Sequence, residues 1–137
     1  MEAVERWLLE IAPTNSFAVL LMTTPPSCEA TTEKACNLIA EAAANGAELV
    51  AFPETYLPGY PYWIWLGTPT WGAPFFKELF KNSVEIESET TDALCAAAHA
   101  ANTHVVMGIN EREGGTLYNT LLYISREGEI LGRHRKL

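Results

Sequence analysis

Basic side chains are scarce in this sequence. Its 137 residues contain 9 lysines and arginines against 17 aspartates and glutamates, which gives a formal net charge of -8. A chain with this balance repels both the phosphate backbone of nucleic acids and an anionic membrane surface. We therefore expect no nucleic-acid partner and no membrane partner, and the basic cluster at residues 133–136 is too short to change that expectation.

Cysteines and long apolar segments are also few. The three cysteines, Cys28, Cys36 and Cys95, have no metal-type spacing, and an odd number argues against a disulfide framework. The apolar run at residues 17–22 is too short to cross a bilayer, and the acidic segment before it lacks the basic region of a signal peptide. These features predict a cytosolic protein with reduced thiols and no metal site.

Apolar residues are present in sufficient number for a packed core. They make up 48% of the chain, and the length suits one domain or a part of a larger one. Continuous apolar runs at residues 16–24 and 47–54 predict two buried strands. Between them, Ser27 is a suitable N-cap for a helix that Gly46 ends. Strand, helix and strand in this order predict a parallel unit of an α/β sheet.

The rest of the chain continues the α/β pattern, with about five strands and three helices in all. The predicted segments are an ordered loop at 55–72, helices near 75–80 and 91–101, a strand at 104–109, a hairpin turning at 114–115 and a last strand ending near 136. A flavodoxin-like binding module also fits this order, but the chain lacks the glycine-rich phosphate loop of such modules.

Glu54 occupies the carboxyl end of the second predicted strand, where functional groups gather in open parallel sheets. The aromatic loop that follows would remove water from the carboxylate and raise its pKa toward that of a general base. Position alone supports another interpretation equally well, namely a carboxylate that caps the next loop.

Three stretches of sequence favour the interpretation of Glu54 as a general base. "GAELVAFPETYLPGYP" (residues 46–61) surrounds Glu54, "YWIWLGTPTWG" follows it, and residues 105–137 contain "GINEREGGTLYNT" and "GRHRKL". Together they resemble the nitrilase superfamily of carbon–nitrogen hydrolases, and the second string resembles the branch that acts on nitriles. The resemblance covers residues 16–137 as an N-terminal part of the family domain, and residues 1–15 remain as an N-terminal extension.

The resemblance implies a Glu–Lys–Cys triad that hydrolyses a small-molecule nitrile to a carboxylic acid and ammonia without a cofactor. Glu54 matches the general base and Lys136 matches the residue that stabilises charge. The family's cysteine follows the lysine strand in a C-W-E context, which none of the three cysteines has. We therefore expect a chain that is truncated before its nucleophile and is inactive alone.

The resemblance also implies a fold and an assembly. The family fold is an α-β-β-α sandwich of four layers, of which about half would be present here, and the family forms homo-oligomers. Tyr60, Trp63 and Trp65 are candidates for the substrate pocket, although aromatic residues in a long loop also serve as packing anchors. Glu111 and Asn119 match positions that look structural, with Asn119 expected to bond to backbone within the sheet.

The sequence is also compatible with other functions. The same triad suits a cyanide hydratase or an amidase, and the features that separate these enzymes from nitrilases lie in the shape of the pocket. A non-catalytic hypothesis also remains, in which the chain associates with full-length nitrilase subunits and modulates their assembly.

Overall fold

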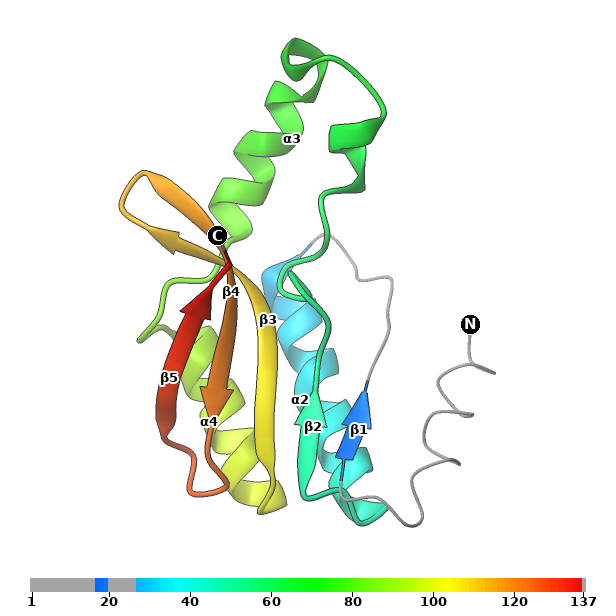
Figure 1. The fold of residues 1–137 in the computed structure, drawn as a ribbon, viewed down its shortest axis with the longest axis vertical. Coiled ribbons are helices and arrows are strands. Elements are labelled where there is room, and N and C mark those ends of the chain that lie inside the picture. Colours follow the sequence, from blue (N-terminus) through cyan, green and yellow to red (C-terminus); the bar gives the residue numbers. More distant parts are fainter. Residues whose placement is uncertain (1–16, 20–26, 137) are drawn as a thin grey trace.

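The structure, a computed structural model, describes residues 17–19 and 27–136. These residues are organised around a single sheet (Figure 1). Its five strands lie in the order β1-β2-β3-β4-β5. The first three run parallel and the last two pair antiparallel with their neighbours. The strands are β1 (Phe17–Val19), β2 (Leu49–Ala51), β3 (His104–Glu113), β4 (Thr116–Ile124) and β5 (Ile130–Arg135).

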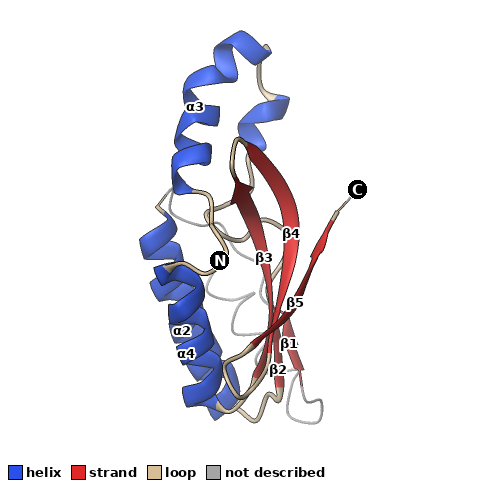
Figure 2. Cartoon of the chain, turned by 90° about the vertical axis from the view of Figure 1, so that its left-hand side faces the viewer, coloured by secondary structure: helices blue, strands red, loops and turns tan. Residues whose placement is uncertain are grey.

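Two helices cover one face of this sheet, and a third projects beyond its end (Figure 2). The covering helices, α2 (Cys28–Ala44) and α4 (Glu89–Ala101), pack against each other as well as on the strands. The projecting part consists of a short 3-10 helix, η1 (Tyr62–Trp65), and of α3 (Pro69–Asn82). The described residues thus form two layers, one of helices and one of strands, and the α/β fold class is confirmed.

The ends of α2 follow from the residues that flank it. The Ser27 hydroxyl accepts a hydrogen bond from the Ala30 N–H at 3.4 Å, which satisfies one of the free donors of the first turn. After the helix, Gly46 has a φ of +91°, a left-handed conformation that glycine adopts without steric cost. Both predictions for this helix are confirmed.

The hydrophobic core lies between the two helices and the sheet. Its largest members include Ile39 of α2, Leu94 of α4 and the strand residues Met107, Leu122 and Ile124, all at most 1% exposed. Alternation along the strands directs these residues to the helical side. We call this side of the sheet the covered face.

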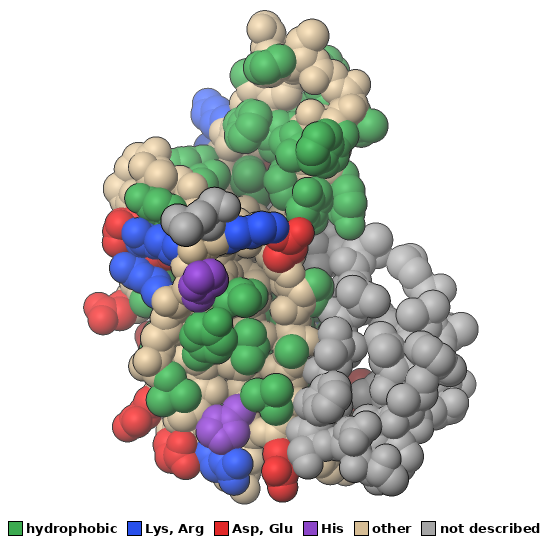
Figure 3. Space-filling model, in the orientation of Figure 1, with side chains coloured by type: hydrophobic (Ala, Val, Ile, Leu, Met, Phe, Trp, Pro, Cys, Tyr) green, Lys and Arg blue, Asp and Glu red, His purple; other side chains and the backbone are tan. Residues whose placement is uncertain are grey.

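The opposite side of the sheet has no layer over it among the described residues. Residues that are paired across neighbouring strands have their side chains on the same face of the sheet. Ala51 pairs with Val106, and Val106 pairs with Tyr123, so these three side chains share the open side. We call this side the open face and define it by Leu49, Ala51, Val106, Leu121 and Tyr123. Figure 3 views the molecule from this side and shows a hydrophobic patch in the middle of the sheet.

Two boundaries differ from the sequence-based predictions. The loop predicted for 55–72 ends earlier, because Thr68 caps α3 by accepting from the Trp71 N–H at 3.3 Å and Pro69 occupies the first helical position. The prolines and glycines that suggested loop therefore belong partly to a helix start. Of the strand predicted at 16–24, only Phe17–Val19 falls within the described residues, and the extension at 1–15 lies outside them.

Candidate functional site

Glu54 lies in a tight turn that interrupts the pairing between two parallel strands. Before the turn, the Phe52 N–H donates to the Val106 carbonyl at 2.8 Å. After it, the Leu57 N–H donates to the Gly108 carbonyl at 3.1 Å, so the chain resumes its place beside β3. Because the turn is anchored on both sides, the position of the Glu54 backbone is fixed relative to the sheet.

The residue after Glu54 adopts an unusual backbone conformation. Thr55 has a φ of +50°, which is the left-handed region, and its side chain is buried. A β-branched residue with this conformation is rare and costs on the order of 1–3 kcal/mol, which the surrounding structure must offset. Such strain concentrates at functional sites, and nothing in the sequence pattern indicated it.

Gly108 allows the turn to approach β3 closely. A Cβ atom at this position would lie 1.9 Å from the Pro53 carbonyl oxygen and 2.8 Å from the Glu54 Cα. Any other residue would therefore push the turn away from the strand. Sequence reasoning missed this role, although a glycine inside a predicted strand is a known signal of close backbone approach.

Three chain segments bring polar side chains together at one end of the open face. The Lys136 Nζ donates to the Glu54 Oε2 at 2.8 Å, and the Asn119 Nδ2 donates to the same oxygen at 2.8 Å. The Lys136 N–H also donates to the Asn119 carbonyl at 2.8 Å, which continues the ladder between β4 and β5. The two residues predicted as base and charge stabiliser, 82 positions apart in the chain, are thus in direct contact.

The expected role of Asn119 is wrong in one respect. Its side chain does not bond to backbone within the sheet but donates to the Glu54 carboxylate. The reason is that Asn119 lies near the start of β4 on the open face, where the turn carrying Glu54 passes over the sheet. Asn119 is therefore part of the candidate site.

The expected raised pKa of Glu54 is also wrong. Hydrogen bonds from Lys136 and then from Asn119, with the positive charge of Lys136, hold the pKa of this carboxyl below its usual range and outweigh the small effect of burial. The Glu54 side chain is 46% exposed, so the aromatic loop does not remove it from water. At neutral pH the carboxylate is charged and able to accept a proton.

Lys136 carries the complementary charge. Its pKa is raised, first by the hydrogen bond to Glu54 and then by the negative charge of that carboxylate, with a small contribution from Tyr60. Its side chain is 64% exposed. An ammonium group next to a carboxylate, both open to incoming molecules, can stabilise negative charge while the carboxylate transfers a proton.

The three aromatic candidates for the substrate pocket separate in the structure. Tyr60 and Trp63 line a cavity of about 240 Å³ between the loop and α3. Trp63 also packs edge-on against Phe76, with 4.3 Å between ring centroids. Trp65 is 75% exposed and does not line this cavity, so it is separated from the other two candidates.

The cysteines lie away from the Glu54–Lys136 pair, on the helices of the covered face. Cys36 donates to the Ala93 carbonyl at 3.7 Å, and burial raises its pKa. Burial and then the charge of Asp92 raise the pKa of Cys95. Neither environment favours a reactive thiolate.

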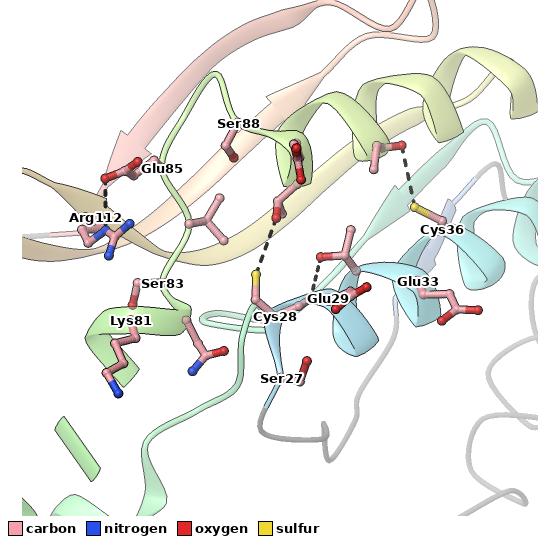
Figure 4. Close-up of a pocket in the computed structure, with 16 residues that line it drawn as sticks. Ser27, Cys28, Glu29, Glu33, Cys36, Lys81, Ser83, Glu85, Ser88 and Arg112 are labelled. Atoms are coloured by element: carbon pink, nitrogen blue, oxygen red, sulfur yellow. Dashed lines mark hydrogen bonds and ion pairs between the residues drawn. The ribbon is translucent and has the colours of Figure 1, made fainter. Parts of the chain in front are cut away.

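A larger cavity, of about 760 Å³, lies beside these thiols rather than beside Glu54. It is formed by the start of α2, the end of α3 and the segment leading into α4, and Cys28 and Cys36 line it (Figure 4). None of the predicted site residues borders it. Among the residues that the structure describes, no group of three or more histidines, cysteines and carboxylates is arranged to hold a metal ion.

Comparison with protein families identifies the family of the chain. The family model described as carbon-nitrogen hydrolase matches residues 17–137, which include Glu54, Asn119 and Lys136. The chain belongs to the carbon–nitrogen hydrolase family. Within the described ranges, no helix of this hydrolase chain is long and apolar enough to cross a membrane.

Curated relatives carry nitrilase names. The chain is 45% identical over 109 residues to a nitrilase of Bacillus sp. (strain OxB-1), covering 80% of this chain and 32% of that protein. It is 44% identical over 128 residues to an aliphatic nitrilase of Rhodococcus rhodochrous, covering 90% of this chain and 35% of the relative. The chain thus spans about a third of the length of these relatives.

Solved structures share the fold. A carbon-nitrogen hydrolase from Helicobacter pylori G27 matches with a TM-score of 0.61 at 22% identity, over 88% of this chain and 39% of that one. The NitFhit protein of C. elegans matches with a TM-score of 0.65 at 20% identity, over 88% of this chain and 27% of the other. The fold seen here therefore recurs within these two larger structures.

Proposed function

We propose that this chain supplies the general base and the stabilising cation of a site that hydrolyses nitriles to carboxylic acids and ammonia. The observation that carries the proposal is the contact between Glu54 and Lys136, which the fold brings together from segments 82 residues apart. The nitrilase relatives at 44–45% identity favour nitriles as the substrate class over cyanide or amides, which suit the same residues.

Hydrolysis of a nitrile needs more than this pair, because the nitrile carbon is a weak electrophile. A thiolate attacks that carbon, a C–S bond forms, and the electron pair that moves to nitrogen takes up a proton to give a thioimidate. One water adds and ammonia leaves, after which a second water cleaves the acyl-enzyme and releases the acid. Glu54 would accept and return the protons, and the Lys136 ammonium would stabilise the developing negative charge.

The nucleophile of this scheme comes from outside the 137 residues in our proposal. Cys28 and Cys36 belong to α2 and Cys95 belongs to α4, the helices of the covered face, whereas Glu54 and Lys136 pair at the end of the open face. Residues 16–137 would then act as the N-terminal part of a hydrolase domain, preceded by an extension at 1–15. The complete enzyme would form homo-oligomers, and the 137-residue chain alone would be inactive.

The test compares the chain alone with the chain joined to the missing segment. Residues 1–137 are fused to the segment that follows the aligned region in the nitrilase of Bacillus sp. (strain OxB-1), and ammonia release is measured with a panel of aliphatic and aryl nitriles. We expect release by the fusion and none by the chain alone. Turnover by the chain alone that Glu54→Ala abolishes would contradict the external nucleophile. A folded fusion that hydrolyses no nitrile would contradict the proposed substrate class.

A further inference from the structure

The last strand of the sheet has little apolar packing to hold it in place. Among the strands that the structure describes, β5 is an edge strand that pairs with β4 alone. Its apolar residues are largely in water, with Leu131 65% exposed and Ile130 37% exposed. The ladder to β4 also contains a register irregularity at Tyr123/Ile124. The turn at 125–129, where the Ser125 N–H donates to the Glu129 carbonyl at 2.8 Å, joins β4 to β5, but the irregularity lies between this turn and the end of β5. Register is weakly specified in strands without a buried face, so a side-chain contact beyond the irregularity adds to the selection of register near Arg135.

Glu111 on β3 provides that interaction from the covered side of the sheet. Its side chain is 1% exposed, and its two carboxylate oxygens accept from side chains on both following strands. Thr120 Oγ1 of β4 donates at 2.8 Å and Arg133 Nη1 of β5 donates at 2.7 Å. Arg135 donates twice, from Nε at 3.0 Å and from Nη2 at 2.6 Å. The carboxylate is therefore bound bidentately by one arginine and singly by another.

The spacing of the two arginines makes this contact specific for one register. Arg133 and Arg135 are two residues apart, so alternation along the strand places both on the side that Glu111 occupies. Lys136 then points to the other side, where Glu54 lies. A slip of β5 by one residue would turn Lys136 away from the open face and would direct Arg135 toward Glu54 instead.

We propose that Glu111 is a positioning residue that selects the register of β5 and thereby holds the Lys136 ammonium against the Glu54 carboxylate. That the Glu54–Lys136 contact matters for catalysis rests on the proposed function. That Glu111 positions Lys136 does not depend on that function. Glu111 touches neither Glu54 nor Lys136 and acts through Arg135, which is adjacent to Lys136 in the chain.

Glu113 offers a matched control on the same strand. Its carboxylate also pairs with the two arginines, at 3.3 Å from Arg133 Nη2 and 2.9 Å from Arg135 Nη2. Its side chain is 54% exposed, so water and salt screen these ion pairs. If removal of any carboxylate near the arginines were enough to disturb the site, Glu111→Gln and Glu113→Gln would behave alike.

The experiment measures the titration of Glu54 by carboxyl-carbon NMR in the native chain, in Glu111→Gln and in Glu113→Gln. Backbone contacts between Thr120 and Arg135, which face each other across the ladder, report the register of β5 in the same samples. In Glu111→Gln we expect the pKa of Glu54 to rise to the ordinary value for glutamate and the Thr120–Arg135 contact to be lost. In Glu113→Gln both should stay as in the native chain.

A folded Glu111→Gln variant with a native Glu54 titration and a native Thr120–Arg135 contact would overturn the proposal, as would equal shifts in both variants. If Glu111→Gln does not fold, Arg135→Gln is measured in its place with the same expected and contradicting results. The experiment uses no substrate, so its failure says nothing about nitrile hydrolysis. Conversely, a fusion without nitrile turnover would leave the positioning by Glu111 intact.

Discussion

The two faces of the sheet are built from alternate residues of the same strands, yet they differ in what they do. The covered face is closed by α2 and α4 and contains the largest buried side chains of the described region. The open face is partly in water and has the Glu54–Lys136 pair at one end. One face therefore packs the α/β layers together, and the other presents the Glu54–Lys136 pair, with Glu111 on the covered face connected to it through Arg135.

Adjacent leucines on β4 allow the sharpest test of this division. Leu122 is 0% exposed on the covered face, whereas Leu121 points to the open face and is half-buried. Leu122→Ala should lower the free energy of unfolding by about 2–5 kcal/mol, because it leaves a cavity in a closed core. Leu121→Ala should cost about 1 kcal/mol or less. Chemical denaturation of both variants measures the contrast, and equal losses would show that the open face is packed as tightly as the covered one.

Substitution of Gly108 tests how closely the Glu54 turn depends on its contact with β3. Gly108→Ala should lower the free energy of unfolding by about 1–3 kcal/mol and should displace the Glu54 turn, because the new Cβ would collide with the Pro53 carbonyl. Gly115→Ala is the control, since a Cβ there would have no neighbour within 4 Å. Denaturation gives the energies, and the NMR shifts of Glu54 and Asn119 report the displacement. A neutral Gly108→Ala with unchanged shifts would refute the close approach.

The buried carboxylate of Glu111 should make stability depend on acid. Burial raises the pKa of Glu111, but the hydrogen bonds from Arg135 and Thr120 and the charges of the two arginines outweigh it and hold the pKa below the ordinary value. Its stabilising contribution is therefore fully present above the unfolded-state pKa of about 4.3 and is lost as pH falls through the lower folded-state pKa. Glu111→Gln should cost about 3 kcal/mol at neutral pH, at the low end for a broken buried pair because both arginines reach water.

Denaturation at about pH 7 and about pH 3 checks this dependence. The difference in stability between the native chain and Glu111→Gln should shrink at the lower pH, because the native carboxyl is then being protonated. A difference that stays constant between the two conditions would show that the Glu111 contacts do not depend on its charge.

The smallest effect on stability is expected at the site itself. Lys136→Met should raise the pKa of Glu54 toward its ordinary value, because its main lowering influence is removed. The free energy of unfolding should hardly change, since both partners are exposed. Lys81→Met removes a similar exposed ion pair, at 2.8 Å from Glu78 on α3, and should leave the Glu54 titration unchanged. A native Glu54 titration in Lys136→Met would argue against the observed contact.

Much of the fold could be predicted from local patterns. The Ser27 cap, the Gly46 stop and the apolar runs indicated the parallel unit, and the hairpin about 114–115 followed from its two glycines. The start of α3 was missed because Pro69 and Gly72 were interpreted as loop residues, although proline suits a first helical turn. Such boundaries depend on cap geometry, which residue types alone do not determine.

Glu54 and Lys136 were predicted as members of the candidate site, but the membership of Asn119 and the electrostatics of the site were not. The pairing of Glu54 with Lys136 followed only from the resemblance to a family, since no spacing rule connects residues 82 positions apart. The raised pKa expected for Glu54 was wrong because the aromatic loop leaves the carboxylate 46% exposed, and because the two hydrogen bonds that lower its pKa come from residues distant in the chain. Asn119 was found only in the structure, where its side chain reaches from β4 to the carboxylate in the turn after β2.

Steady-state ammonia release by the fusion protein tests most directly the claim that Glu54 and Lys136 act as one hydrolytic unit. We expect Glu54→Gln and Lys136→Met each to lower kcat/KM for a nitrile by about 10²–10⁴-fold, while the exposed-pair control Lys81→Met keeps native turnover. Native turnover in folded Glu54→Gln or Lys136→Met would show that the two residues do not act together in hydrolysis.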